Sequence, residues 1–442
     1  MSKVVDLISK ESPENRSAFI AKSFTDNYKH LMDGDASAWR GKFRKMAQSP
    51  LAFYRGTAAL FYADVSRDDD PFLNDKTSRV WIQGDMHAEN FGTYMNGKGV
   101  LVFDVNDFDE ATVAPFTWDV KRFCASLALI GYQKALSDLE IRDVIQRAAQ
   151  CYANQISRFA TGQDKNFVIH SGTAKGPVLE VLQKGKQLTR FGLLDGESDI
   201  VDGDRRFKNN NNFIQLSEAE KLKVRAALAE YFETIPERKR RSDMVYEVKD
   251  IARRKGLGIG SAGLMMISTL LEGPTEALEN DILISMKTAL PSAAAKYVND
   301  PKVNKYFKHE GHRTATSQRA LQVNADPFLG YCSLDGVGMF VTEISPYTAD
   351  LDWSDINDLD DILDLVENLA RCVAKIHCVS DEDSDHTLVD YSTEDEINKV
   401  LNGRESEFVH YIVGFSEGYA KCVVNDYQLF VDAFRNKRIG GI

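Results

Sequence analysis

Residues 84–90 have the sequence GDMHAEN, and residues 102–107 have the sequence VFDVND. The apolar segments 91–95 and 100–105 are typical of strands, and residues 96–99 (NGKG) predict a hairpin turn between them. The pattern predicts a loop that carries an acid and an amide, followed by a hairpin and by further acids at the end of its second strand. These two stretches are the most informative part of the sequence for both fold and function.

The side chains in these two stretches are of the types that phosphoryl transfer requires. The reaction needs an aspartate that accepts the proton of the attacking hydroxyl, and an asparagine and an aspartate that hold Mg²⁺ on the phosphates. A turn that uses Asp and Asn for local backbone hydrogen bonds is the alternative. Asp85 and His87 also match the start of the binuclear metallophosphatase motif, but the further histidine motifs of those enzymes are missing from the sequence.

A glycine cluster at residues 256–263 (GLGIGSAG) is the second candidate for phosphate binding. Its GxGxxG spacing lets the backbone approach phosphate oxygens, although a tight hairpin without a ligand has the same composition. A dinucleotide-binding fold fits less well, because the segment before the cluster is polar and a Gly-Pro turn follows too soon for a long helix. The segment 282–287 (ILISMK) predicts a strand that ends at Lys287, whose ammonium group can reach phosphate oxygens.

The composition is that of an ordinary globular chain. Its 442 residues include 54 Lys and Arg and 66 Asp and Glu, so the net charge is −12, which argues against nucleic acid or an anionic membrane as a partner. The six cysteines form no CxxC pair, which indicates reduced thiols. We find neither a signal peptide nor an apolar run of about 18 residues that could span a membrane. We therefore expect a cytoplasmic protein, and the sequence leaves its oligomeric state open.

The order of predicted elements indicates an α+β protein of two lobes. Helical periodicity covers residues 14–65, 117–160, 216–236, 309–323, 356–378 and 405–436, strand patterns cover 79–108, 244–287 and 338–344, and the Gly-, Asp- and Asn-rich segment 161–215 is typical of a loop. We assign residues 1–240 to a helical lobe, 241–350 to a β-rich nucleotide-binding lobe, and 351–442 to helices that complete the first lobe. Asp119, near the start of a predicted helix, either caps that helix or braces the loop at 84–90 from behind.

Residues 84–90 and 102–107 resemble the catalytic loop and the metal-binding segment of aminoglycoside-phosphotransferase-like members of the protein-kinase-like fold. More closely, the chain resembles the family catalogued as domain of unknown function 2252. The matching stretches are residues 49–65, 84–92, 102–110, 115–129, 256–263, 284–289, 309–322 and 370–377. The resemblance implies a two-lobed kinase-like fold. In a kinase the glycine loop precedes the catalytic loop, whereas here it follows, so we infer a circular permutation.

This resemblance also implies roles for the candidate residues of the first lobe. Asp85 is the expected catalytic base, and His87 is a second candidate catalytic residue on the same loop. Asn90 and Asp104 are the expected metal ligands, with Asp104 the principal one. Asp107 is a further candidate ligand.

The second lobe would bind the phosphates of ATP. The candidate contacts are Gly258, Gly260, Ser261 and Gly263 in the glycine cluster and Lys287 on the following strand. ATP and Mg²⁺ are therefore the expected cofactors.

One position departs from the resemblance. Thr316 stands where we expect an acidic partner for the phosphate-binding lysine, and Glu310 lies two helical turns away from it. We expect an ATP- and Mg²⁺-dependent phosphotransferase that acts on an unknown hydroxyl acceptor, a small molecule rather than a protein. The alternatives are a nucleotide-binding pseudokinase that acts as a switch or scaffold, and an AMP transferase.

Overall fold

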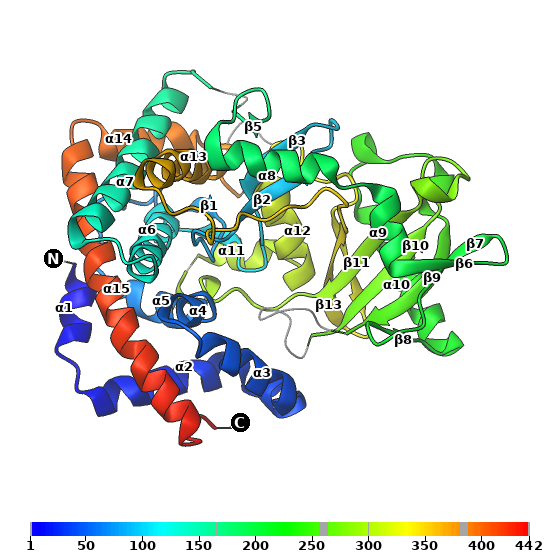
Figure 1. Ribbon diagram of the computed structural model, residues 1–442, viewed down its shortest axis with the longest axis horizontal. Coiled ribbons are helices and arrows are strands. Elements are labelled where there is room, and N and C mark those ends of the chain that lie inside the picture. Colours follow the sequence, from blue (N-terminus) through cyan, green and yellow to red (C-terminus); the bar gives the residue numbers. More distant parts are fainter. Residues whose placement is uncertain (1, 165–166, 256–263, 299, 381–387, 441–442) are drawn as a thin grey trace.

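The computed structural model describes residues 2–164, 167–255, 264–298, 300–380 and 388–440. The chain forms a larger helical body and a smaller body built on a β-sheet, and both ends of the chain lie on the helical body (Figure 1). The fold class predicted from the sequence, α+β, is confirmed. No helix among the described residues combines the length and the apolar character that a bilayer crossing needs.

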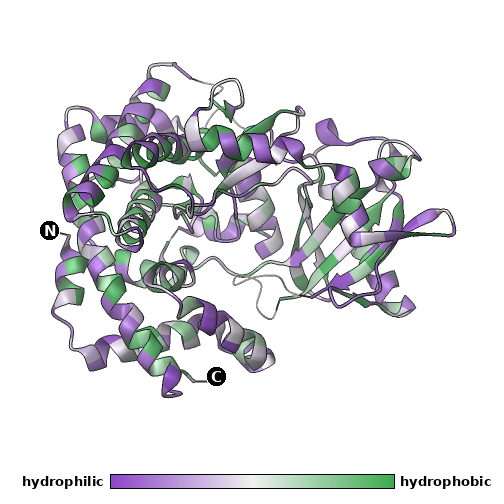
Figure 2. Cartoon of the chain, in the orientation of Figure 1, coloured by the Kyte–Doolittle hydropathy of each residue, from purple (hydrophilic) through white to green (hydrophobic). Residues whose placement is uncertain are grey.

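The helical body contains segments from both ends of the chain. Its helices are α1 (Lys3–Ser9), α2 (Pro13–Gly34), α3 (Ala36–Met46), α4 (Pro50–Arg55), α5 (Ala58–Val65), α6 (Phe116–Gln133), α7 (Asp138–Ala160), α8 (Gly176–Gln187), α11 (Pro301–Tyr306), α13 (Leu359–Cys378), α14 (Thr393–Leu401) and α15 (Glu405–Arg435). In Figure 2 the helices carry green, hydrophobic stretches beside purple, hydrophilic ones, as expected for helices that bury one face. The predicted helix 14–65 is divided because the side chains of Asp35 and Ser49 each accept a backbone N–H and so begin a new helix.

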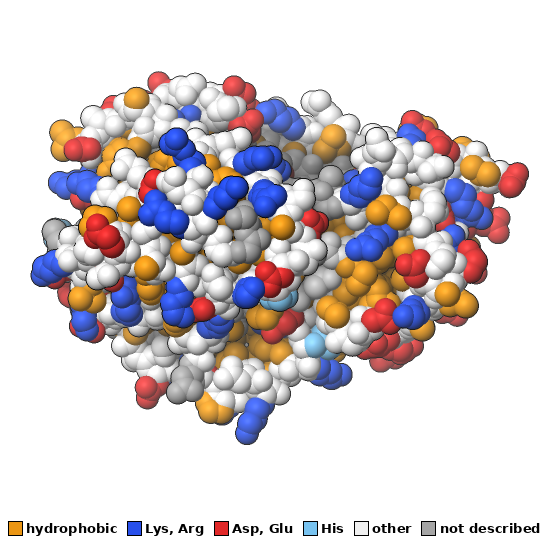
Figure 3. Space-filling model, turned by 90° about the horizontal axis from the view of Figure 1, so that it is seen from below, with side chains coloured by type: hydrophobic (Ala, Val, Ile, Leu, Met, Phe, Trp, Pro, Cys, Tyr) orange, Lys and Arg blue, Asp and Glu red, His pale blue; other side chains and the backbone are white. Residues whose placement is uncertain are grey.

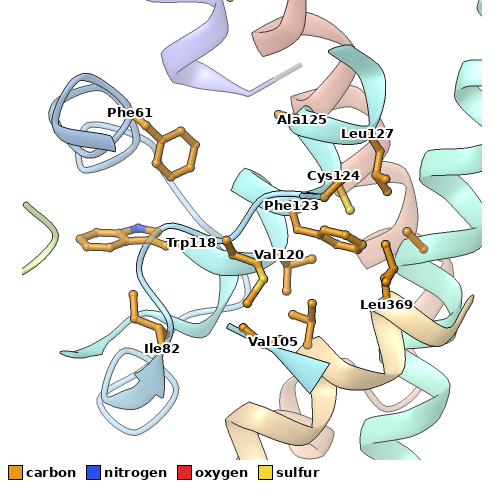
Figure 4. Close-up of a cluster of buried hydrophobic side chains, with 14 of the residues drawn as sticks. Phe61, Ile82, Val105, Trp118, Val120, Phe123, Cys124, Ala125, Leu127 and Leu369 are labelled. Atoms are coloured by element: carbon orange, nitrogen blue, oxygen red, sulfur yellow. The ribbon is translucent and has the colours of Figure 1, made fainter. Parts of the chain in front are cut away.

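Helix α6 is the centre of the helical body. Every residue from Phe116 to Gly131 is buried, so the helix has no face open to solvent. Figure 4 shows side chains of α6, among them Val120 and Phe123, packed against Ile82, Val105 and Leu369 of other elements. A helix with no exposed face must be covered on every side, and here strand β1 and helices α4, α7, α13 and α15 supply that cover.

Two small antiparallel sheets lie beside α6. Strand β1 (Val80–Ile82) pairs with β4 (Thr112–Ala114), and β3 (Leu101–Val105) lies between β2 (Phe91–Met95) and β5 (Ile169–His170). The hairpin predicted at residues 91–105 is confirmed by the register Phe91↔Val105 to Met95↔Leu101. These strands position the loop 83–90, which joins β1 to β2, next to the segment 106–111, which joins β3 to β4.

The smaller body is built on a six-stranded antiparallel sheet with the order β12-β13-β11-β10-β9-β8. Its strands are β8 (Phe213–Gln215), β9 (Val248–Arg254), β10 (Met266–Leu271), β11 (Ile282–Thr288), β12 (Gly330–Leu334) and β13 (Val337–Glu343). The body also contains the helices α9 (Arg190–Glu197), α10 (Glu218–Thr234) and α12 (Glu310–Leu321) and the hairpin of β6 (Ser198–Val201) and β7 (Asp204–Phe207). Short 3₁₀ helices are η1 (Glu237–Lys239), η2 (Asp243–Tyr246), η3 (Leu278–Asn280) and η4 (Ala295–Tyr297).

The two faces of this sheet bury different helices, because successive side chains of a strand point to opposite faces. Ile282, Ile284 and Met286 of β11 pack in one hydrophobic cluster with α10, whereas Leu283 packs in another with Leu194 of α9. Lys287 follows the alternation of Leu283 and therefore lies on the face opposite α10. Helix α12 packs on β12 and β13 and also contacts β1 and β4, so it connects the two bodies.

The segment 161–215 differs from its prediction as a loop. It contains β5, α8, α9 and the strands β6 to β8. Its Gly, Asp and Asn residues lie at the turns, for example Asp202 and Gly203 with positive φ. The regular elements between them are too short for their periodicity to be evident. The expected lobe boundary at residue 240 also differs from the packing, because α9 and α10 cover the six-stranded sheet.

A buried ion cluster joins the N-terminal helix α2 to the C-terminal helix α15. The guanidinium group of Arg16 donates to both carboxylate oxygens of Asp64 at 2.8 and 2.6 Å and to those of Asp426 at 2.9 and 2.6 Å. Arg16 is only 3% exposed. Asp64 also pairs with Arg67 at 2.6 Å, whereas Arg16 is the cation that the described residues give to Asp426. Because burying charges is costly unless they are paired, Asp426 depends on this arginine.

We predict that Arg16→Ala lowers the free energy of unfolding by about 3–5 kcal/mol, because it leaves the carboxylate of Asp426 buried without its cation and that of Asp64 with Arg67 alone. Urea denaturation followed by circular dichroism measures the effect. Lys22→Ala is the matched control on the same helix, since its ion pair with Asp26 is exposed, and it should cost about 0.5 kcal/mol or less. Equal losses in the two variants would contradict a structural role for the Arg16 cluster.

Candidate active site

The loop 83–90 makes a tight turn at Gly84, directly before Asp85. Gly84 has φ +84°, and a Cβ placed there would lie 2.3 Å from the carbonyl oxygen of Glu110. Only glycine fits both conditions. The loop is therefore pressed against the segment that follows β3, and the two sequence stretches that suggested a site lie side by side.

Asp119 holds the backbone of this loop from behind. Its buried carboxylate accepts the N–H of Gln83 at 2.7 Å and the N–H of Gly84 at 3.0 Å. His377 at the end of α13 contacts the same carboxylate at 3.4 Å, and Tyr152 of α7 contacts His377 at 2.8 Å. Of the two roles considered for Asp119, bracing the loop is the one that the structure supports.

The carboxylate of Asp85 is paired with a buried arginine. Arg122 Nε donates to Asp85 Oδ1 at 2.9 Å, and its Nη2 donates to the same oxygen. The guanidinium carbon of Arg122 lies 4.4 Å from the centre of the Tyr54 ring. Burial raises the pKa of Asp85, and the charge of Arg122 opposes this rise. The side chain of Asp85 keeps 19% of its surface exposed, so a substrate can reach it.

Asn90 is oriented by the loop itself. Its Nδ2 donates to the backbone oxygen of Asp85 at 2.8 Å, and its own backbone oxygen accepts the N–H of Asn106 at 3.1 Å. Among the described residues, none donates a hydrogen bond to Asn90 Oδ1. Asn90 is itself buried, at 6% exposed, and differs from Asp104 in that its side-chain oxygen has no protein donor among the described residues.

Asp107 lies on the segment that contacts this loop. Gln83 Nε2 donates to the backbone oxygens of Asn106 and Asp107, and Asp107 has φ +54°. The side chain of Asp107 is exposed. Crowding by surrounding atoms and the neighbouring carboxylate of Asp109 raise the pKa of Asp107 to about 6.

Lys287 joins the sheet to this segment. Its ammonium group forms an ion pair with Asp109, two residues after Asp107. Burial lowers the pKa of Lys287, but the charges of Asp109 and Asp107 outweigh burial and leave the pKa raised. Thr316 does not supply the acidic partner, and Glu310 pairs instead with Arg313. The acidic partner of Lys287, which the family resemblance led us to expect on a helix, therefore comes from the segment after β3.

Arg313 of α12 fixes the backbone of the same segment. It donates to the carbonyl oxygens of Ala111 at 2.6 Å, Asp109 at 2.9 Å and Leu290 at 2.6 Å. The helix that packs on the sheet is thus tied to the acids of the helical body. Figure 3 shows the underside of the molecule, where acidic and hydrophobic side chains lie at the junction of the two bodies.

Two predicted site residues lie elsewhere. Asp104 is 4% exposed, and its Oδ2 pairs with the buried ammonium group of Lys375 while its Oδ1 accepts the N–H of Val105. This geometry argues against Asp104 as the principal metal ligand. His87 is 2% exposed, and burial with the charges of Arg55 and Arg122 holds its pKa well below the usual value. A buried neutral imidazole is not available to a substrate, so the catalytic assignment of His87 is not supported.

The structure brings Asp85, Asn90, Asp107 and Lys287 together, and it adds Asp109 and Arg122, which sequence reasoning missed. The spacing DFDE at residues 107–110 was the available signal for Asp109. Arg122 gave none, because a basic residue on a predicted helix is ordinary. The candidate residues Gly258, Gly260, Ser261 and Gly263 lie outside the described residues.

Comparison with protein families identifies one match, over residues 35–433, to the family described as "Uncharacterized protein conserved in bacteria (DUF2252)". The chain belongs to the DUF2252 family. Neither curated proteins nor solved structures gave a match.

Asn90 and Asp107 are the residues of this DUF2252 protein that could hold a Mg²⁺ ion. Among the described residues, no group of three or more His, Cys, Asp or Glu side chains is arranged to hold a metal ion. Mg²⁺ does not require such a cage, because one or two carboxylates hold it together with water and substrate phosphates. The free amide oxygen of Asn90 and the exposed carboxylate of Asp107 fit that requirement.

Glu110 gives a prediction about stability and pH. Burial and the charge of Asp85 raise the pKa of Glu110 to about 7. The hydrogen bond that its carboxylate accepts from the N–H of Ala293 opposes this rise. An unfolded glutamate titrates near about 4.3. Between these values the folded chain binds more protons than the unfolded chain, so this group makes stability fall as the pH rises.

We predict that Glu110→Gln removes this contribution and retains an oxygen acceptor for Ala293. The difference in the free energy of unfolding, variant minus wild type, should become more positive by about 1–3 kcal/mol between pH 4.5 and pH 7.5. Urea unfolding at the two pH values measures it, with Glu14→Gln on the exposed face of α2 as control. A difference between variant and wild type that is independent of pH would contradict the raised pKa.

Proposed function

We propose that this protein is an ATP- and Mg²⁺-dependent phosphotransferase that transfers the γ-phosphate of ATP to a hydroxyl acceptor. One observation carries the proposal: Asp85, Asn90 and Asp107 of the helical body lie together, and Lys287 of the sheet reaches the same segment through Asp109. These are the side-chain types that phosphoryl transfer uses to position and neutralise the reacting groups.

In this proposal Asn90 and Asp107 hold the metal. Mg²⁺ would neutralise charge on the phosphates when bound. Asp107 takes the role first assigned to Asp104, because the carboxylate of Asp104 is committed to Lys375 in the core. Gln83 supports the assignment, since it binds the backbone of both Asp85 and Asp107 and so fixes the acid of the loop relative to the metal-binding acid.

Lys287 would bind phosphate oxygens as a point charge. It lies on β11. The glycine cluster at 256–263 lies in the connection from β9 to β10, of which β10 pairs with β11 and β9 lies beyond β10. We propose that Gly258, Gly260, Ser261 and Gly263 contact the nucleotide from this connection. The ion pair with Asp109 would keep the lysine directed toward Asp107.

Asp85 would act as the base. The hydroxyl oxygen of the acceptor forms the new bond to the γ-phosphorus, the bond from that phosphorus to ADP breaks, and the hydroxyl proton passes to Asp85. A raised pKa makes the carboxylate a better proton acceptor, and burial produces that rise. Arg122 keeps enough of the group ionised to function, because its charge opposes the effect of burial.

The chain order is consistent with a circularly permuted kinase-like fold. The loop and its acids precede the sheet in the sequence, and the chain then returns through residues 344–358 to α13. Lys375 and His377 on this returning helix contact Asp104 and Asp119, which flank the site. A helix from the end of the chain therefore supports the loop from its start, as the permutation requires.

A nucleotide-binding scaffold without catalysis is the second candidate. The observation that favours it is the ion pair of Lys287, which is made with Asp109 and not with an acid of α12. The two candidates differ in turnover and not in nucleotide binding.

We predict that Mg²⁺–ATP raises the melting temperature of the wild type more than ATP with EDTA does, because a ligand of the native state stabilises it. Asp107→Asn should remove most of this metal dependence, whereas Asp104→Asn should lower the melting temperature of the free protein instead. Differential scanning fluorimetry measures both effects. The absence of any nucleotide shift at millimolar concentration would contradict the proposal, and loss of the metal effect in Asp104→Asn alone would restore Asp104 as the ligand.

We predict that Asp85→Asn retains ATP affinity within about twofold and lowers turnover by about 10²–10⁴-fold, the usual contribution of a general base. ATP consumption is measured in a metabolite extract, and nucleotide affinity by calorimetry. Glu89→Gln is the control on the same loop, because Glu89 pairs with Arg55 and is not part of the proposed machinery. Turnover in Asp85→Asn equal to that of the wild type would exclude the base, and absence of turnover in the wild type would favour the scaffold.

A further inference from the structure

A chain of three buried polar side chains leads from the helices behind the site to the loop that carries Asp85. Tyr152 of α7 is hydrogen-bonded through its hydroxyl to Nδ1 of His377, near the end of α13, at 2.8 Å. Nε2 of the same ring lies 3.4 Å from Oδ2 of Asp119, in the first turn of α6. The three residues are at most 1% exposed, so bulk water does not supply their hydrogen bonds.

The partners of His377 decide where the protons of its ring lie. Asp119 accepts backbone N–H groups at both oxygens, and an ionised carboxylate has no proton to donate, so Nε2 of His377 carries the proton between them. In a neutral imidazole Nδ1 is then an acceptor, and the hydroxyl of Tyr152 donates to it. A second proton on the ring would turn this hydroxyl into an acceptor and leave its own proton without a partner among the described residues. The contacts therefore select the neutral ring with its proton on Nε2.

His377 adds a third donor to a carboxylate that already holds the loop. Oδ2 of Asp119, which faces His377, also accepts the N–H of Gln83 at 2.7 Å, and Oδ1 accepts the N–H of Gly84 at 3.0 Å. A carboxylate bound only by the two backbone N–H groups could turn together with the loop. Because His377 belongs to another helix, its hydrogen bond fixes the carboxylate relative to the helical body.

The side chain of Gln83 carries this constraint on to both acids of the site. Its Oε1 accepts the N–H of Asp85 at 2.8 Å, and its Nε2 donates to the backbone oxygens of Asn106, at 3.1 Å, and Asp107. Gln83 is fully buried, so these bonds are not exchanged for water. The backbone that Asp119 holds therefore sets the position of Asp85 relative to Asp107.

A role in packing alone would not require these polar atoms. The ring of His377 packs edge-on against Tyr152 and Phe116, with centroids 5.6 and 6.3 Å apart. An apolar ring fills such a space without burying two nitrogens. Buried polar networks rigidify a structure when every member is satisfied, and here both ring nitrogens have partners. What the histidine adds to the packing is a donor at a fixed position.

We propose that His377 is a positioning residue for the reaction at Asp85, and that the hydroxyl of Tyr152 fixes the tautomer in which it acts. This proposal rests on the proposed function and extends it to residues outside the site. His377 contacts neither nucleotide nor acceptor in this scheme, and acts through Asp119 on the loop. A displacement of a reacting group by about 1 Å can cost about 10²-fold in rate, so a small shift of the loop is sufficient.

Hydrogen exchange tests the contact with the loop and does not require turnover. The full chain is exchanged in deuterated buffer, and the amides of Gln83 and Gly84 are followed relative to those of α6. We expect His377→Phe, which keeps a buried ring, to accelerate exchange of the two loop amides by about tenfold or more. His377→Gln should restore most of the protection, because its side-chain nitrogen can replace Nε2 as the donor.

Val366→Ala is the matched control for lost stability. Val366 is fully buried on α13, about three turns before His377. The substitution should destabilise the helical body through the cavity that it creates, and leave exchange of the loop relative to α6 within about twofold of the wild type.

Turnover tests the consequence for the proposed reaction. His377→Phe should lower kcat by about tenfold to 100-fold and leave the affinity for Mg²⁺–ATP within about twofold, since His377 is not part of the proposed nucleotide site. ATP consumption in a metabolite extract measures the first, and calorimetry the second. His377→Gln should recover most of the turnover, and Val366→Ala should retain it. If His377→Phe fails to fold, Tyr152→Phe takes its place and should act in the same direction.

The outcomes separate this proposal from the proposed function. Exchange of Gln83 and Gly84 that is equal in His377→Phe and the wild type overturns the positioning role, and so does an unchanged kcat or a loss of kcat that Val366→Ala shares. A wild type without turnover, in which His377→Phe still accelerates exchange of the loop, overturns the proposed function alone and leaves His377 as the residue that holds the loop.

Discussion

The buried carboxylate of Asp119 is the constraint on which the arrangement of this site depends. It accepts the two backbone N–H groups directly before Asp85, and it sits in the first turn of α6, a helix that is enclosed on every side. A charge with no exposure must keep its hydrogen bonds, because losing one leaves an unsatisfied charge in the core. The loop is therefore held by a helix whose residues from Phe116 to Gly131 are all buried. The side chain of Asp85 can therefore face solvent while the backbone of the loop stays fixed.

The acids around the loop divide into those that build the fold and those that are free for chemistry. Asp104 and Asp119 are buried and fully engaged, the first with Lys375 and the second with the loop. Asp85 and Asp107 keep exposed surface. This division is the reason that we move the proposed metal-binding role from Asp104 to Asp107: on a strand with both faces covered, an acid points into the core and requires a buried cation.

The sequence predicted the elements whose patterns are local. The hairpin at 91–105 has its turn residues in place, and the long helices α13 and α15 have clear apolar periodicity, so each was predicted from its own residues. The prediction of a loop at 161–215 was wrong, because the helices and strands of this segment are short and depend on packing against the sheet. For the site, the loop residues Asp85 and Asn90 were evident from their spacing. Arg122 gave no signal, since its partner Asp85 is distant in the sequence. Asp109 had a signal in the spacing of the acids at 107–110, but its role depends on a fold that brings Lys287 to it.

Asp109 also explains how the site can be assembled without an acidic residue at Thr316. Where a helix supplies the partner of the phosphate-binding lysine, movement of that helix can separate the two residues. Here the partner lies two residues from the proposed metal ligand, and its backbone oxygen is bound by Arg313 of α12. The lysine of the sheet, the helix on the sheet and the segment 106–111 thus meet at one residue. Any shift of the sheet that breaks the pair with Asp109 also changes the surroundings of Asp107, so a single short segment of chain couples the position of the lysine to the proposed metal ligand.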